Sequence, residues 1–184
     1  LLIIDEIQTG MGRTGKLFAH QHYDVEPDVF TLAKGIGSGF PVGAMLAKQP
    51  YTAGFAPGAH ASTFGGTPIA MAAVAATIET MLAQDVPAKA AEASEYLFAQ
   101  LHKLLDGIPG IQQIRGKGLL IGILCDEPVG DAIAELHRRG LLVVTAGPNV
   151  IRLLPNLLVT REEIDEAVAM IAAVLTERAA AKQP

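Results

Sequence analysis

The sequence predicts an α/β protein in which part of a mainly parallel sheet precedes a smaller α+β domain. The chain starts with the apolar run 1–5, which is typical of a strand buried on both faces in a parallel sheet. Two long helix-like segments follow, and strand-like and helix-like segments alternate after them. We therefore expect residues 1–106 to be the C-terminal part of a large domain, including a helix that links the domains, and residues 107–184 to form a small C-terminal domain.

The first part of the chain alternates apolar strands with Gly-rich loops. After the run 1–5, strands are predicted at 28–33 and 42–47. A Gly-rich turn follows the first strand, and the Gly-rich segment 34–41 follows the second. Lys34 is therefore expected where a strand ends.

Two helices are predicted next. Pro68 suits the first turn of a helix over 68–83, and the small side chains nearly all round it predict a buried helix. Pro87 opens a second helix that runs to about residue 106, with leucines at helical spacing. This second helix is the expected link between the domains.

The rest of the chain predicts a compact α+β arrangement. Strands are expected at 119–124, 141–144 and 150–154, and helices at 129–139 and 161–178. The segment Arg115-Gly116-Lys117-Gly118 reads as a turn in which Arg115 is a surface charge.

Composition excludes several classes of function. The net charge is −5, and we find neither a Lys/Arg cluster nor interleaved aromatic residues, which argues against nucleic-acid binding. The single cysteine, Cys125, lies in an apolar run and predicts a buried thiol in a reducing compartment. Scattered histidines predict no metal site. No run reaches transmembrane length and no signal peptide is found, so a cytoplasmic protein is expected, and the abrupt start indicates part of a longer polypeptide.

Asp5 and Lys34 carry the chemistry that the sequence predicts. Each ends an apolar run, so the two side chains are expected at the same carboxyl edge of two neighbouring strands. Pyridoxal phosphate requires a lysine that bonds its aldehyde and an acid that keeps its ring nitrogen protonated. The simpler alternatives are a capping role for Asp5 and a solvated, snorkelling ammonium for Lys34.

Three ordered motifs make the prediction specific. The segments 5–10 (DEIQTG), 12–15 (GRTG) and 31–35 (TLAKG) resemble the signature of the class III aminotransferases, a fold-type I pyridoxal-phosphate family. The similarity continues through 62–66 (STFGG), 115–118 (RGKG) and 151–155 (IRLLP), so it covers nearly the whole chain. The family's earlier half, with its phosphate-binding backbone and ring-stacking aromatic residue, is not in this sequence.

The resemblance implies a role for each residue around the cofactor. Lys34 forms the imine bond to pyridoxal 5'-phosphate and is the catalytic residue, while Asp5 pairs with the ring nitrogen. Ile7 packs on one face of the ring, and Gln8 reaches the phenolic oxygen.

The same resemblance implies that the active sites are shared in a homodimer. Ser62 and Thr63 match the hydroxyl pair that contacts the cofactor phosphate of the neighbouring subunit, although such a pair alone is more often a cap. Arg152 matches the arginine that binds a substrate carboxylate, and the alternative is a structural ion pair.

The implied reaction is transfer of an amino group from N-acetylornithine to 2-oxoglutarate in arginine biosynthesis. The segments 10–15 and 62–66 look closest to that branch. Ornithine, succinylornithine and 4-aminobutyrate stay open as amino donors, whereas Gln8 and Thr63 disfavour an aminomutase. A truncated, non-catalytic homologue that dimerises with a complete subunit is the alternative of another class. Alone, the chain is expected to bind the cofactor weakly and to lack activity.

Overall fold

The computed structural model describes residues 1–49 and 51–181, which form two compact units. The first unit is Leu1–Ala88, and the second begins at Lys89. The sequence predicts a first domain that ends at residue 106, and helix α2 (Val86–Leu105) accounts for the difference because its apolar side chains join the core of the second unit. The domain boundary of the whole protein stays a prediction.

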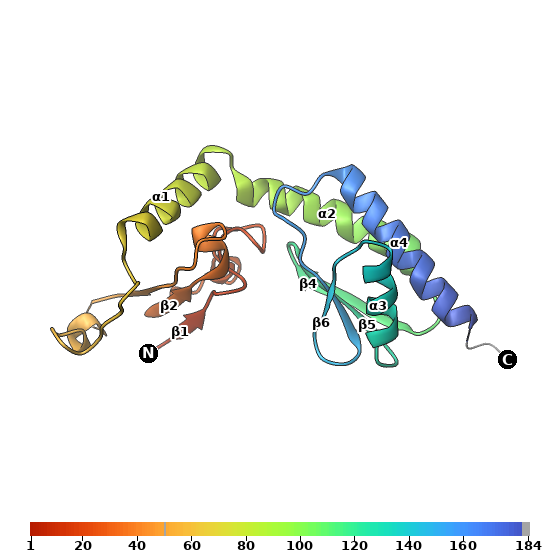
Figure 1. Cartoon of the computed structure of the whole chain (residues 1–184), viewed down its shortest axis with the longest axis horizontal. Helices are drawn as coiled ribbons and strands as arrows, with labels where there is room; N and C mark the ends of the chain where they lie inside the picture. The colour runs from red at the N-terminus through yellow and green to blue at the C-terminus, as the bar shows by residue number, and fades with distance from the viewer. Residues whose placement is uncertain (50, 182–184) are drawn as a thin grey trace. The chain divides into compact units, whose positions relative to one another are not determined.

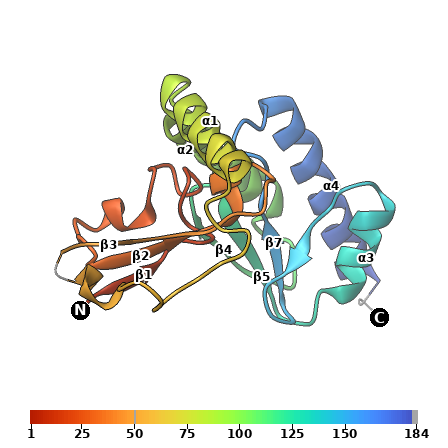
Figure 2. The same ribbon diagram turned by 60° about the vertical axis from the view of Figure 1, so that its left-hand side comes forward.

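The first unit contains a three-stranded sheet in the order β1-β2-β3 (Figure 2). Strand β1 (Ile3–Asp5) runs parallel to β2 (Val29–Leu32), and β3 (Ala44–Ala47) is antiparallel to β2. The described residues of the unit also form the short 3-10 helices η1 (Ala19–His22), η2 (Lys34–Gly37) and η3 (Tyr51–Gly54), and the α-helix α1 (Pro68–Ala83). Parallel pairing brings the ends of β1 and β2 to one edge of the sheet.

The prediction that the first strand and the first helix are buried is wrong for this chain. β1 is an edge strand, and Ile3 is 60% exposed. Helix α1 packs mainly against η2 and buries only Ala70 and Met81. An apolar strand or helix is predicted to be covered by other elements. Which elements cover it is not specified by its own residues, because the covering layer comes from another part of the fold.

The second unit is an antiparallel sheet in the order β4-β5-β7-β6, with helices packed on it (Figure 1). Its further elements are β4 (Ile111–Lys117), β5 (Leu120–Cys125), α3 (Gly130–Arg138), β6 (Val144–Thr145), β7 (Val150–Leu153) and α4 (Arg161–Ala180). Alternate residues of the central strands, such as Ile121, Ile123 and Ile151, point into a core that they share with α2, α3 and α4. The opposite face of the sheet therefore carries the intervening residues.

Strand β4 is the main element that the sequence prediction lacks. Arg115 lies within this strand, so its assignment to a turn is wrong, and the chain turns at Gly118 and Leu119 instead. An irregularity between Ile111 and Gln113 shifts the register of β4 against β5, which breaks the alternation by which strands are recognised. The strand expected at 141–144 is reduced to the short β6.

Within the described residues, no single helix is long and apolar enough to cross a membrane. Helices α1 and α2 satisfy the length and composition criterion only as a pair. The same residues hold no group of three or more His, Cys, Asp or Glu side chains arranged to bind a metal ion.

Candidate active site

Asp5 is the last residue of β1 and lies opposite Thr31 of β2. One carboxylate oxygen, Oδ1, accepts the backbone N–H of Ile7 at 2.8 Å and the Thr31 hydroxyl at 3.4 Å. Across residues 1–49 and 51–181, no hydrogen bond to the second oxygen is recorded. Asp5 is exposed, so this held carboxylate can still receive a proton donor from a ligand.

Lys34 follows β2 by two residues and begins η2 in a strained backbone conformation. Its φ angle is +48°, in the left-handed region that residues other than glycine rarely occupy. Such strain is found mostly where the surrounding structure fixes a residue for function. The side chain is exposed, and its ammonium has no ion pair or hydrogen bond within the part of the chain that the structure describes.

The parallel pairing places Asp5 and Lys34 at the same edge of the first sheet. Asp5 is in register with Thr31, and the chain reaches Lys34 just after β2 ends. The predicted pairing of these two strands is therefore confirmed. What each side chain does at this edge stays a prediction.

Two glycines allow the loops at this edge to pack closely. A Cβ atom at Gly10 would lie 2.7 Å from the backbone oxygen of Glu6 and 3.0 Å from a methyl carbon of Leu32. A Cβ atom at Gly35 would lie 3.3 Å from the Cβ of Met11, which is buried. The loop after β1 thus packs directly on β2 and on the loop that carries Lys34.

Glu6 is the residue of this region that the sequence analysis missed. It directly follows Asp5, and its side chain is fully buried. One carboxylate oxygen accepts a hydrogen bond from the backbone N–H of His20 at 2.8 Å, and Nδ1 of the His20 ring lies 3.0 Å from the same oxygen. The His20 ring stacks on Phe18. An acidic residue next to the strand-ending Asp5 was the available signal, because strand alternation turns it to the opposite side.

The other residues of the first unit that are predicted to contact the cofactor differ in their exposure and hydrogen bonding. Ile7 is half-buried beside Asp5, and Gln8 is exposed. The Ser62 hydroxyl accepts the backbone N–H of Gly65 at 2.9 Å, and both Ser62 and Thr63 are exposed. Among the described residues, no hydrogen bond joins this segment to Asp5 or Lys34, so its role in phosphate binding stays a prediction.

Arg152 lies on β7 in the second unit. It is half-buried, and its Nε atom is buried with no hydrogen-bond partner among the described residues. The ion pairs recorded for these residues do not include Arg152, so the structural ion pair considered above has no support here. A buried guanidinium N–H without an acceptor is destabilising, so an anion that accepts its hydrogen bond would stabilise this arginine.

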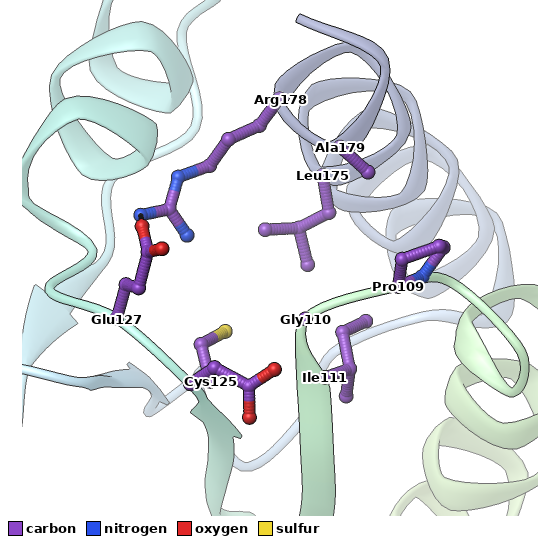
Figure 3. A pocket seen from close by; sticks show the side chains of 9 residues that line it. Pro109, Gly110, Ile111, Cys125, Glu127, Leu175, Arg178 and Ala179 are labelled. Atoms are coloured by element: carbon purple, nitrogen blue, oxygen red, sulfur yellow. Dashed lines mark ion pairs between the residues drawn. The ribbon is translucent and has the colours of Figure 1, made fainter. Parts of the chain in front are cut away.

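A cavity of about 250 Å³ in the same unit contains an arginine that, unlike Arg152, is paired with acidic residues (Figure 3). Cys125, 1% exposed as the sequence predicts, lies in its wall with Leu175. Nε of Arg178 lies 3.0 Å from an oxygen of Asp131, and the same guanidinium approaches Glu127 at 3.9 Å. The charge of this arginine is already balanced, so we assign the cavity no ligand.

The chain also resembles known proteins. Residues 1–175 match the family described as Aminotransferase class-III. The chain belongs to the class III aminotransferases. The family uses pyridoxal phosphate, as the three motifs around Asp5 and Lys34 predict.

Relatives and solved structures of class III aminotransferases agree with this assignment. Acetylornithine aminotransferase of Bacillus subtilis (strain 168) is 53% identical over 183 residues, which are 100% of this chain and 47% of that protein. Acetylornithine aminotransferase of Streptococcus mutans is 50% identical over 96% of this chain and 47% of that protein. The chain therefore spans about half the length of the curated relatives it matches.

Solved structures of this class show the same fold. Ornithine aminotransferase of Toxoplasma gondii ME49 superposes with a TM-score of 0.92 at 32% identity, over 99% of this chain and 45% of that one. Acetylornithine aminotransferase of Elizabethkingia anophelis gives a TM-score of 0.89 at 35% identity, over 96% of this chain and 46% of that one. The fold-type I class predicted from the motifs is thus confirmed.

The residues of this class III chain fit pyridoxal phosphate chemically. Lys34 offers an amine that no acidic group holds within the described residues, and Asp5 offers a carboxylate oxygen without a recorded donor. These are the two groups that the cofactor's aldehyde and ring nitrogen require.

Proposed function

We propose that the protein containing this chain is a pyridoxal-phosphate-dependent transaminase that moves an amino group from N-acetylornithine to 2-oxoglutarate in arginine biosynthesis, and that it acts in the cytoplasm. The observation that carries the proposal is the strained, exposed Lys34 at the same sheet edge as Asp5. The amino donor is supported by the 53% identity to the acetylornithine aminotransferase of Bacillus subtilis.

Lys34 and Asp5 have different roles in the proposed reaction. When bound, the cofactor supplies an aldehyde carbon for an amine and a ring that withdraws electrons. Lys34 would hold the cofactor through the nitrogen of its side chain, and the same Nζ atom would accept and return a proton at the substrate carbon. Asp5 keeps a proton on the ring nitrogen, and its hydrogen bonds from Ile7 and Thr31 fix the direction of the carboxylate.

The remaining site residues bind and orient. Ile7 packs on the ring, and Gln8 donates to its phenolic oxygen. Ser62 and Thr63 bind the cofactor phosphate of a second subunit, which makes the protein a homodimer with shared sites. Arg152 binds a substrate carboxylate, and its unpartnered Nε supports this assignment.

Ornithine is the second candidate for the amino donor. It stays open because an ornithine aminotransferase shares the fold that holds these residues, with a TM-score of 0.92 at 32% identity. Assaying the whole protein with N-acetylornithine and with ornithine separates the two donors.

The test of the proposed chemistry is borohydride reduction of the 184-residue chain with pyridoxal phosphate, followed by peptide mass spectrometry. Reduction traps even a weakly populated imine, so we expect the label on Lys34 and its loss in Lys34→Ala. In the whole protein, Lys34→Ala should abolish turnover. Selective labelling of Lys16 or Lys48 instead would refute the site.

A further inference from the structure

Met11 has the same kind of backbone strain as Lys34. Its φ angle is +54°, in the left-handed region, although it carries a side chain. The residues before and after it, Gly10 and Gly12, are glycines. A third glycine would make this turn without strain, so the backbone alone gives no reason for a methionine here. The reason must lie in the contacts that the side chain makes.

The side chain of Met11 packs on the loop that carries Lys34. Met11 is only 5% exposed. A Cβ atom added to Gly35 would lie 3.3 Å from the Cβ of Met11 and 3.8 Å from its Cγ, so the backbone of Gly35 lies directly on this side chain. Gly35 follows Lys34 in η2. Because the two residues share a peptide bond, a shift of Gly35 changes the dihedral angles of Lys34.

The later part of η2 is held by other elements of the first unit. Ile36 is 3% exposed, and α1 packs mainly against η2. A Cβ atom added to Gly37 would lie 2.6 Å from a methyl carbon of Val42, so the chain is also tightly packed at that point. The end of η2 is thus fixed by the body of the unit, whereas Met11 contacts its start.

The direction of the Lys34 side chain depends on the conformation that this contact supports. The φ and ψ angles of a residue set the direction of its Cα–Cβ bond relative to the flanking peptides. An ordinary, negative φ at Lys34 would therefore point the same side chain in a different direction. A displacement of about 1 Å at a reacting group can lower a rate by about a hundredfold, so this direction matters for an amine that reacts.

We propose that Met11 is a positioning residue that holds Lys34 in the left-handed conformation through its contact with Gly35, and so sets the direction in which the amine projects. The inference rests on the proposed function for the role of that amine. Met11 acts through Lys34 and needs no contact of its own with substrate or cofactor. The strain at Met11 is then offset by the strained geometry that it maintains at Lys34.

The first measurement is the conformation of Lys34 in the cofactor-free 184-residue chain. Nuclear magnetic resonance gives the three-bond coupling between its amide and α protons, which depends on φ. Met11→Gly keeps the turn and removes every atom that contacts Gly35, so this coupling should change. Met11→Leu fills a similar volume and should keep the wild-type coupling. Asp24→Gly is the matched control, because Asp24 is exposed and also left-handed, with a φ of +51°.

A second variant disturbs the contact from the other side and leaves Met11 in place. Gly35→Ala adds a methyl group 3.3 Å from the Cβ of Met11, which forces a shift of a few tenths of an ångström, and it should also change the coupling at Lys34. Gly54→Ala adds the same group where no atom lies within 4 Å among the described residues, and it should change nothing. Unshifted amides in β1 and β2 verify that each variant is folded.

Reductive labelling with pyridoxal phosphate measures the consequence at the amine. The ratio of label on Lys34 to label on Lys48 in the same folded sample should fall about tenfold in Met11→Gly and in Gly35→Ala, since the displacement is smaller than the one that lowers a rate a hundredfold. Met11→Leu and the two controls should keep the wild-type ratio. A residue that only stabilises the fold would lower the urea midpoint without changing this ratio.

The outcomes separate this inference from the proposed function. If Met11→Gly and Gly35→Ala are folded and keep both the coupling and the labelling ratio of the wild type, Met11 only fills the core and the inference is wrong, while the proposed function stands. If the wild type itself shows no preferential label on Lys34, the proposed function fails and the inference fails with it. A changed coupling together with a reduced ratio, both restored in Met11→Leu, supports the inference.

Discussion

Nδ1 of His20 lies 3.0 Å from a carboxylate oxygen of Glu6, whose side chain is fully buried. The backbone N–H of His20 donates to the same oxygen, and the hydroxyl of Thr9 donates to the other. Glu6 therefore ties the segment of η1 and the Gly-rich loop to the end of β1. Because Glu6 directly follows Asp5, this buried cluster fixes the chain where the site begins.

Replacing Glu6 with Gln should lower the free energy of unfolding of the first unit by about 1–3 kcal/mol, because an amide places a donor among groups that already donate. Urea denaturation of the chain measures the change. Glu26→Gln removes the same charge at a side chain that is 83% exposed, and it should change stability by less than about 0.5 kcal/mol. Equal effects of the two substitutions would show that the buried cluster is not stabilising.

The contribution of Glu6 should also depend on pH. Burial by itself raises the pKa of the Glu6 carboxyl, but hydrogen bonds from Thr9, His20 and Ala19 outweigh it and lower the pKa below the ordinary value. A lowered pKa in the folded state means that the stabilisation is complete above the unfolded value of about 4.3 and is lost as the pH falls through the folded pKa. The gap in stability between the wild type and Glu6→Gln should therefore shrink in acid, as the pH falls through the folded pKa of Glu6. A gap that stays unchanged in acid would contradict this origin.

The left-handed backbone at Lys34 predicts an unusual order of stabilities. Lys34→Gly should be more stable than Lys34→Ala by about 1 kcal/mol, because only glycine adopts a φ of +48° without strain. Lys48, which is not among the positive-φ residues, provides the matched control, and there the Ala variant should be the more stable one. Thermal denaturation of the four variants tests the order, and an Ala variant at position 34 as stable as the Gly variant would argue against strain.

Helix α4 begins with a reciprocal cap. Thr160 Oγ1 accepts the backbone N–H of Glu163 at 3.2 Å, and the Glu163 carboxylate accepts the N–H of Thr160 at 2.8 Å. Thr160→Ala should destabilise the second unit by about 0.5–2 kcal/mol, whereas Thr160→Ser keeps the hydroxyl and should stay close to the wild type. Hydrogen exchange of the first-turn amides measures this. If the Ser variant exchanges as fast as the Ala variant, the hydroxyl is not the stabilising group.

The sequence by itself determined which elements of this protein place Asp5 and Lys34, because strand ends and Gly-rich turns are local features. It also determined the helix α4, whose start is fixed by the capping residues Thr160 and Glu163. The class III family followed from short motifs, since these also are read along the chain.

Only the tertiary structure decided what each residue faces. It buried Glu6 against His20, exposed most of α1, and turned the segment around Arg115 into a strand. Arg115, Gly122 and Arg152 lie in one row only because the register of three antiparallel strands aligns them. Register and burial depend on contacts between residues far apart in the chain, and a shift of one residue would turn each side chain to the other face of the sheet.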